Sequence, residues 1–138
     1  IAVLLVILLR DVAASLKILT PLALGGLITV ALMVVFEIPF NFANVVALPL
    51  LFGVGVDNGI HLVYRHRNGQ LPGDNVLRTA TARGIVFGAM TTALSFGNLA
   101  FSPHTGTATM GIVLAMGLSL IVLATLIVLP AMLHRKAA

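Results

Sequence analysis

The sequence is poor in charged residues, and this scarcity excludes most soluble proteins. Only 9% of its 138 residues are charged, whereas 59% are hydrophobic. A typical soluble domain carries about 25% charged residues. So few polar side chains cannot cover the core of a globular domain of this length. The composition therefore predicts an integral membrane protein.

Cysteine and tryptophan are also absent, and tyrosine occurs once. Without cysteine the chain has no disulfide, no thiolate metal site and no cysteine nucleophile. Eight Lys and Arg residues outnumber four Asp and Glu, an excess that suggests nucleic-acid binding in a soluble protein. Here the basic residues occupy short gaps between apolar runs, with almost no aromatic residues to stack on bases. We therefore expect no nucleic-acid partner.

Four apolar stretches are long enough to cross a membrane, which takes about 17–25 mostly apolar residues in a helix. They are residues 18–36, 42–64, 84–101 and 107–133. Residues 1–9 are apolar but too short to span, so we interpret them as the tail of a longer helix and the chain as a fragment. The sequence predicts an all-α, polytopic transmembrane helix bundle in contact with membrane lipids.

The basic residues sort to one side of the path that these stretches describe. Two precede the first span, four lie between the second and third, and two follow the fourth, whereas the connections at 37–41 and 102–106 have none. The positive-inside rule places the basic side in the cytoplasm. We expect a cytoplasmic connection at 66–83 with an interfacial helix at 75–83, capped by Asp74, or alternatively a plain solvated loop.

One acid interrupts the apolar pattern inside a span. Asp57 lies two-thirds of the way along the 42–64 stretch, where an ionised side chain costs roughly 2.5–3.5 kcal/mol on insertion scales. Such a residue is normally tucked into the bundle and paired, or reached by water. It can then gain and lose a proton as its surroundings rearrange. Asp57 is therefore a candidate proton relay, and a structural polar contact is the alternative.

Small and polar residues accompany this acid. Gly53, Asp57 and His61 recur every four residues, so they lie close to one helix face. Gly55 and Gly59 would let a neighbouring helix approach closely. We expect these three glycines to serve helix packing around the relay. His61 is a candidate to share the proton with Asp57, although an anchor at the headgroup level is the alternative.

Hydroxyls in the third span are candidate hydrogen-bond partners for Asp57. They belong to Thr91, Thr92 and Ser95. The commoner arrangement for such residues is a hydrogen bond back to a carbonyl of their own helix. Both arrangements are compatible with the sequence.

The run Gly53-Val-Gly-Val-Asp57-Asn-Gly-Ile-His61 resembles the Gly-x-x-x-Asp signature of the resistance–nodulation–division (RND) superfamily. That signature lies on the fourth helix of each six-helix half. The runs Ser95-Phe96-Gly97-Asn98-Leu99-Ala100-Phe101-Ser102 and Val128-Leu129-Pro130-Ala131-Met132-Leu133 are typical of the lipid-exporting branch that includes the MmpL proteins. The resemblance implies that the chain supplies the end of helix 2 and helices 3–6 of one half.

Within this branch the sequence looks most like the carboxy-terminal half of the hopanoid transporters of Gram-negative bacteria. The resemblance implies an inner-membrane exporter of hopanoid-like lipids, a homo-oligomer when full-length, with protons as the coupling ion. It implies no cofactor, no metal site and no enzymatic activity. The other transmembrane half would supply a second relay carboxylate, so this piece alone should not transport.

One position departs from the usual MmpL pattern, in which Tyr follows this Asp. Asn58 stands there instead, which argues against a carboxylate–phenol relay and suits the hopanoid group. We count Asn58 among the candidate relay residues.

Other classes of membrane protein share parts of the pattern. Intramembrane aspartyl proteases need Gly-x-Gly-Asp and a second membrane Asp, but here Val56 separates Gly55 from Asp57 and the other spans have no Asp. SecD/SecF-like proteins carry different signatures around the equivalent helix. A sterol-sensing or Patched-like sensor or scaffold without transport stays the alternative, because a fold alone does not separate transport from sensing.

Overall fold

A computed structural model describes residues 1–68 and 79–134 of the protein. In it, the chain forms a bundle of helices. Its elements are α1 (Ala2–Leu9), α2 (Val12–Val35), α3 (Phe42–Arg67), α4 (Ala80–Gly97), the short 3₁₀ helix η2 (Asn98–Phe101) and α5 (Thr105–His134). No strand occurs in either described range, so the predicted all-α fold is confirmed. Four segments, α2, α3, α4 with η2, and α5, are long and apolar enough to cross a membrane.

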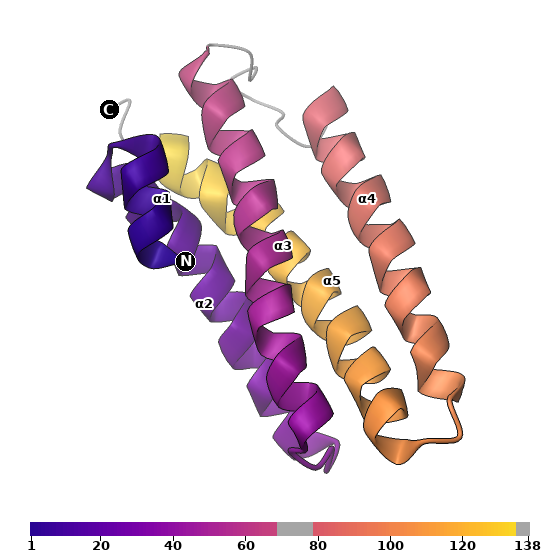
Figure 1. The fold of residues 1–138 in the computed structure, drawn as a ribbon. Helices are drawn as coiled ribbons and strands as arrows, with labels where there is room; N and C mark the ends of the chain where they lie inside the picture. The colour runs from indigo at the N-terminus through magenta and orange to yellow at the C-terminus, as the bar shows by residue number, and fades with distance from the viewer. Residues whose placement is uncertain (69–78, 135–138) are drawn as a thin grey trace.

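The last helix forms the centre of the bundle (Figure 1). α5 packs against α2, α3 and α4, whereas α1 packs mainly against α2. Fully buried side chains of α5 include Val113, Leu114, Leu118, Ile121 and Leu129. α4 lies at the edge of the bundle and buries only Ala82 and Ile85. Most of the surface of α4 that faces away from α5 is therefore exposed.

Three of the long helices begin at a polar capping residue. Asp11, Asn41 and Thr79 each accept a hydrogen bond from the backbone N–H three residues later, at 3.1, 3.0 and 3.2 Å. Such caps satisfy amide groups that have no partner inside the helix. They fix the first turns of α2, α3 and α4.

The helices extend beyond the apolar stretches of the sequence. α2 begins at Val12 although its apolar stretch begins at residue 18, and α4 begins at Ala80 although its stretch begins at 84. The reason is that the backbone hydrogen bonds of each helix begin at its cap and continue past the basic residue, Lys17 in α2 and Arg83 in α4. The long side chains of these residues can reach the membrane surface. Residues 75–78 of the predicted interfacial helix and its expected cap Asp74 lie outside the described residues. The remainder is the start of a membrane helix rather than a separate interfacial one, because Thr79 caps α4 and residues 80–83 belong to it.

Two asparagines hold the connection between α2 and α3. Asn44 is fully buried, and its side-chain amide donates to the carbonyl of Pro39 at 2.8 Å. The amide of Asn41 donates to Thr109 Oγ1 at 2.9 Å. Because Thr109 belongs to α5, these bonds fasten the α2–α3 turn to the start of the central helix.

Glycines allow two backbones to touch the central helix. A Cβ on Gly25 of α2 would lie 2.8 Å from Ile121 Cα, and one on Gly111 would lie 2.6 Å from the carbonyl oxygen of Phe96. Real Cβ contacts are essentially never this short. Only glycine therefore permits this close packing of α2 on α5, and of α5 under the end of α4.

Candidate functional site

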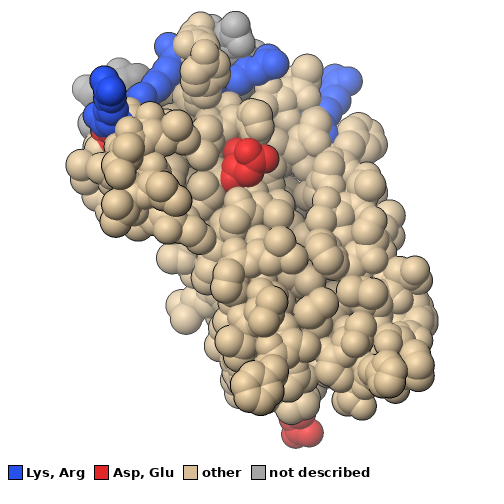
Figure 2. Space-filling model, in the orientation of Figure 1, with Lys and Arg blue, Asp and Glu red and all other residues tan. Residues whose placement is uncertain are grey.

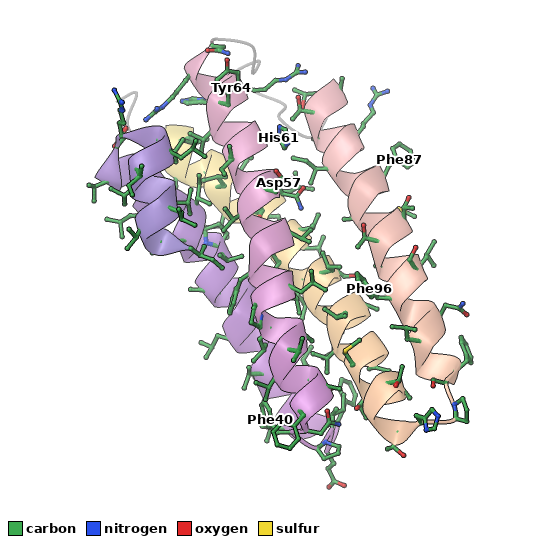
Figure 3. All side chains as sticks on the ribbon, viewed as in Figure 1. Phe40, Asp57, His61, Tyr64, Phe87 and Phe96 are labelled. Carbon is green, nitrogen blue, oxygen red and sulfur yellow. The ribbon has the colours of Figure 1, made fainter. Side chains whose placement is uncertain are left out.

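The two faces of α3 differ in what they contact. One face is buried against the bundle through Asn44, Ala47, Leu51, Gly55, Gly59, Leu62 and Val63. The opposite face carries Gly53, Asp57 and His61, all of which are exposed. Figure 3 labels Asp57 and His61 on successive turns of α3. Asp57 and His61 thus share one face, as their spacing predicts.

Asp57 and His61 form a pair one helical turn apart. The distance from Asp57 Oδ1 to His61 Nε2 is 3.6 Å, and the two side chains are 70% and 65% exposed. His61 is the partner nearer to the basic end of the molecule. The pair is therefore assembled within α3 itself and needs no other helix of this chain.

The exposure of Asp57 differs from the expected burial inside the bundle. The face of α3 that packs on α2 and α5 is occupied by Leu51, Gly55 and Gly59. A residue two positions from Gly55 and two from Gly59 must point to the other side of the helix. Asp57 therefore lies on the open face, where Figure 3 labels it.

Asn58 lies between the two faces. Its side chain is half-buried, whereas Asp57 beside it is exposed. The position lies on the flank of the Asp57–His61 pair rather than in line with it.

The three glycines near Asp57 have different surroundings. A Cβ on Gly55 would collide with Leu22 and with Ile121 Cγ2, and one on Gly59 would lie 2.6 Å from Ile18 Cγ2. Gly55 and Gly59 therefore allow α3 to pack closely on α2 and α5. Gly53 has no atom within 4 Å of such a Cβ, so the packing expected of Gly53 does not occur among the described residues.

The candidate hydroxyl partners bond to their own helix. Thr91, Thr92 and Ser95 donate to the carbonyls four residues earlier, at 2.9, 2.8 and 2.8 Å. The predicted bond from these hydroxyls to Asp57 is therefore not formed in this structure. The physical reason is that a local acceptor is always within reach on a helix, whereas α3 and α4 touch only sparingly.

Charge is separated along the bundle (Figure 2). The basic residues gather at one end, and the described ones are Arg10, Lys17, Arg65, Arg67 and Arg83. Glu37 lies in the connection at the opposite end. Asp57 precedes Arg65 by eight residues, about 12 Å along a helix. Its carboxylate therefore lies inside the apolar zone, away from the basic end.

An ion pair at the basic end was not predicted from the sequence. Arg67 Nη2 donates to Asp11 Oδ2 at 2.5 Å, which joins the end of α3 to the start of α2. The N–H of Ala14 donates to the same carboxylate and, together with Arg67, holds the pKa of Asp11 below its ordinary value. The sequence signal was an acid directly before a helix, which is a typical cap.

Metal binding has no support in the part of the chain that the structure describes. Residues 1–68 and 79–134 contain no group of three or more His, Cys, Asp or Glu side chains that could hold an ion. Asp57 and His61 together supply two such side chains.

Comparison with known proteins identifies the family. The model of the MMPL family matches residues 1–137. Two relatives named hopanoid transporter HpnN, from Rhodopseudomonas palustris and Burkholderia multivorans, are 44% and 37% identical, and each alignment covers 98% of this chain. Membrane protein MJ1562 of Methanocaldococcus jannaschii is 30% identical over 96% of this chain.

The matched region is a small part of these relatives. It spans 15% of each HpnN protein and 36% of MJ1562. No solved structure matches the chain significantly. The four apolar helices and these relatives make the chain part of a multi-pass membrane protein. With a family match that extends over nearly its whole length, the resemblance is confirmed, and the chain belongs to the MMPL family.

Proposed function

We propose that this chain is the proton-relay part of one half of an RND-type, proton-driven lipid exporter. The observation that supports it is the Asp57–His61 pair, 3.6 Å apart on the outward face of a membrane-spanning helix. A carboxylate in hydrocarbon is costly unless it is protonated, paired or reached by water. An acid kept on a membrane-spanning helix despite this cost suggests a role that depends on its change of charge.

The open face of α3 is where the rest of the transporter would pack. Asp57 cannot face lipid tails in its ionised form without a cost of roughly 2.5–3.5 kcal/mol. Gly53 on the same face has no neighbour within 4 Å of a Cβ position. A small residue and an acid on one exposed stripe suit close approach by another polar helix. We assign that helix to the other transmembrane half, which would also carry the second relay carboxylate.

Proton binding at Asp57 would couple the membrane potential to movement. Protonation of Asp57 removes the repulsion between its carboxylate and the second relay carboxylate, so the two halves can shift relative to each other. A charge that crosses the field gains about 2.3 kcal/mol per 100 mV. This free energy is available to each proton that passes, and no cofactor is needed.

The substrate and the location follow from the relatives and the charge pattern. Two relatives carry the name hopanoid transporter, and we extend a hopanoid-like lipid substrate to this chain. The gathering of Lys and Arg at one end supports a cytoplasmic position for that end, with the helices in a bacterial inner membrane. The homo-oligomer expected for the full-length protein stays a prediction.

The test is the substitution Asp57→Asn in the full-length protein. We expect normal membrane insertion and thermal stability, but loss of export of a radiolabelled hopanoid from inner-membrane vesicles and loss of proton uptake in proteoliposomes. Asp57→Glu keeps the carboxylate and should retain part of both activities. Glu37→Gln makes the matching change at an acid outside the spans and should export normally. Normal export by Asp57→Asn would overturn the relay role.

A further inference from the structure

A small cavity lies at the basic end, where α2, α3 and α5 meet. Its volume is about 160 Å³, and it is separate from the Asp57–His61 pair. Asp11, Lys17, His66 and Arg67 form its polar part, while Val63 and Leu133 contribute apolar surface. The cavity thus combines cationic groups with an apolar wall at one membrane boundary.

Arg67 is held in a fixed position on this cavity. Its Nη2 donates to Asp11 Oδ2, and its Nη1 donates to the carbonyl of Leu9 at 3.4 Å. A guanidinium has five N–H donors in a rigid plane. Two bonds therefore orient Arg67 and leave three donors for another acceptor, such as phosphate oxygen.

Asp11 does not prevent an anion from binding here. Its Oδ2 accepts from Arg67, and its Oδ1 accepts from the backbone N–H of Ala14 at 3.1 Å. Both oxygens are thus turned toward donors of the protein. The charge of Asp11 is offset by Arg67, which leaves Lys17 as the remaining positive charge of this group.

Lys17 has no carboxylate partner within 4 Å among residues 1–68 and 79–134. It follows Asp11 by six residues, which is about 9 Å along a helix. In the orientation that the positive-inside rule gives, Lys17 lies near the cytoplasmic boundary of the apolar zone. A lysine there extends its ammonium group toward the headgroups.

We propose that this cavity binds the phosphate headgroup of an anionic phospholipid of the surrounding leaflet. Lys17 and the free donors of Arg67 bind the phosphate, and one net positive charge matches the single charge of phosphatidylglycerol. Basic cavities between membrane helices on the cytoplasmic side are suited to such headgroups.

A membrane lipid fits better than a soluble anion because of the adjoining surface. Val12 and Leu16 flank this part of α2, and their side chains are 58% and 59% exposed. They lie at the membrane boundary, where acyl chains would cover them. A lipid therefore satisfies the cationic cavity and the apolar surface at the same time. The proposal does not depend on the relay function of Asp57.

The test is lipid binding to the purified full-length protein, measured by native mass spectrometry with phosphatidylglycerol and phosphatidylcholine as probes. We expect a preference for phosphatidylglycerol that Lys17→Gln lowers about fivefold, the factor expected for one basic residue at an anionic surface. Lys17→Arg should restore most of it. Arg83→Gln removes the same charge at the same end, outside the cavity lining, and should leave the preference within about twofold.

Three results would overturn the proposal. The first is an absence of preference in the unmodified protein. The second is an equal loss in Lys17→Gln and Arg83→Gln, which would indicate general surface charge. The third is displacement of bound phosphatidylglycerol by inorganic phosphate, which lacks acyl chains and would assign the cavity to a soluble anion. Thermal unfolding of each variant, unchanged from the unmodified protein, ensures that the losses report binding.

Discussion

The carboxylate of Asp57 and the imidazole of His61 lie 3.6 Å apart, both on the face of α3 that turns away from the rest of the bundle. Direct proton transfer needs heavy atoms about 2.6–3.2 Å apart, or one bridging water. A small rotation of either side chain, or one water, closes the remaining gap. Because His61 is on the cytoplasmic side of Asp57 in the proposed orientation, it is placed to pass a proton between Asp57 and that end of the membrane.

His61 is the residue whose substitution separates a relay from an anchor. His61→Gln keeps a polar side chain near the headgroups but cannot bind a proton near neutral pH. If His61 passes the proton, export by the full-length protein should fall at least tenfold, because positioned acid–base groups contribute about 10²–10⁴-fold. Proton uptake by proteoliposomes should fall together with export.

The control for this experiment is another histidine outside the spans. His104→Gln makes the same change in the connection between η2 and α5 and should leave export and proton uptake unchanged. Normal export and proton uptake in His61→Gln would instead identify His61 as an anchor.

Substitutions at two glycines of α3 should separate an effect on stability from an effect on assembly with the other half. Gly55→Val inserts a side chain against Leu22 and Ile121, and overpacking of this kind costs typically 1–3 kcal/mol. Thermal unfolding of the full-length protein in detergent should therefore shift to lower temperature. Gly53→Val meets no described atom within 4 Å of the new Cβ, so it should preserve the bundle but impair export if the other half packs on that face as proposed.

Two results would contradict these roles of Gly53 and Gly55. If Gly53→Val exports normally, Gly53 faces lipid, and the open face of α3 is not where the other half packs. If Gly55→Val unfolds at the normal temperature, α3 can shift away from Ile121 at little cost.

The number of spans could be predicted because hydrocarbon imposes a length and a composition that few other environments require. The ends of the helices could not be predicted in this way. Hydropathy marks where the apolar residues begin, whereas a helix begins where its backbone hydrogen bonds begin. Asp11 and Thr79 start their helices several residues before the apolar stretches. The side chain of Lys17 is compatible with a helix at the membrane boundary, so its charge does not end the helix.

The spacing of Gly53, Asp57 and His61 could predict a shared face, since helical periodicity is independent of tertiary structure. The direction of that face could not be predicted. Residues on both sides of α3 are mostly apolar in a membrane, so hydrophobicity does not distinguish lipid from protein. The direction became clear only from the close packing of Gly55 and Gly59 on α2 and α5.

The pairing of Asp11 with Arg67 should make stability depend on pH in the acidic range. Hydrogen bonds from Ala14 and the charge of Arg67 lower the pKa of Asp11 in the folded state. The folded protein therefore binds this proton less tightly than the unfolded chain, whose Asp has a pKa of about 3.9. The stabilisation is fully present above that value and is lost as the pH falls through the lower folded-state pKa.

Asp11→Asn tests this assignment in the full-length protein. The unmodified protein should unfold at a higher temperature than Asp11→Asn at pH 6, and the difference should shrink steadily below about pH 4. Glu37→Gln removes an acid that has no ion pair among residues 1–68 and 79–134, so its difference from the unmodified protein should change less over the same range. If the Asp11→Asn difference is constant from pH 6 to pH 3, the ionised carboxylate does not stabilise the junction of α2 and α3, and Arg67 is held there by the carbonyl of Leu9 alone.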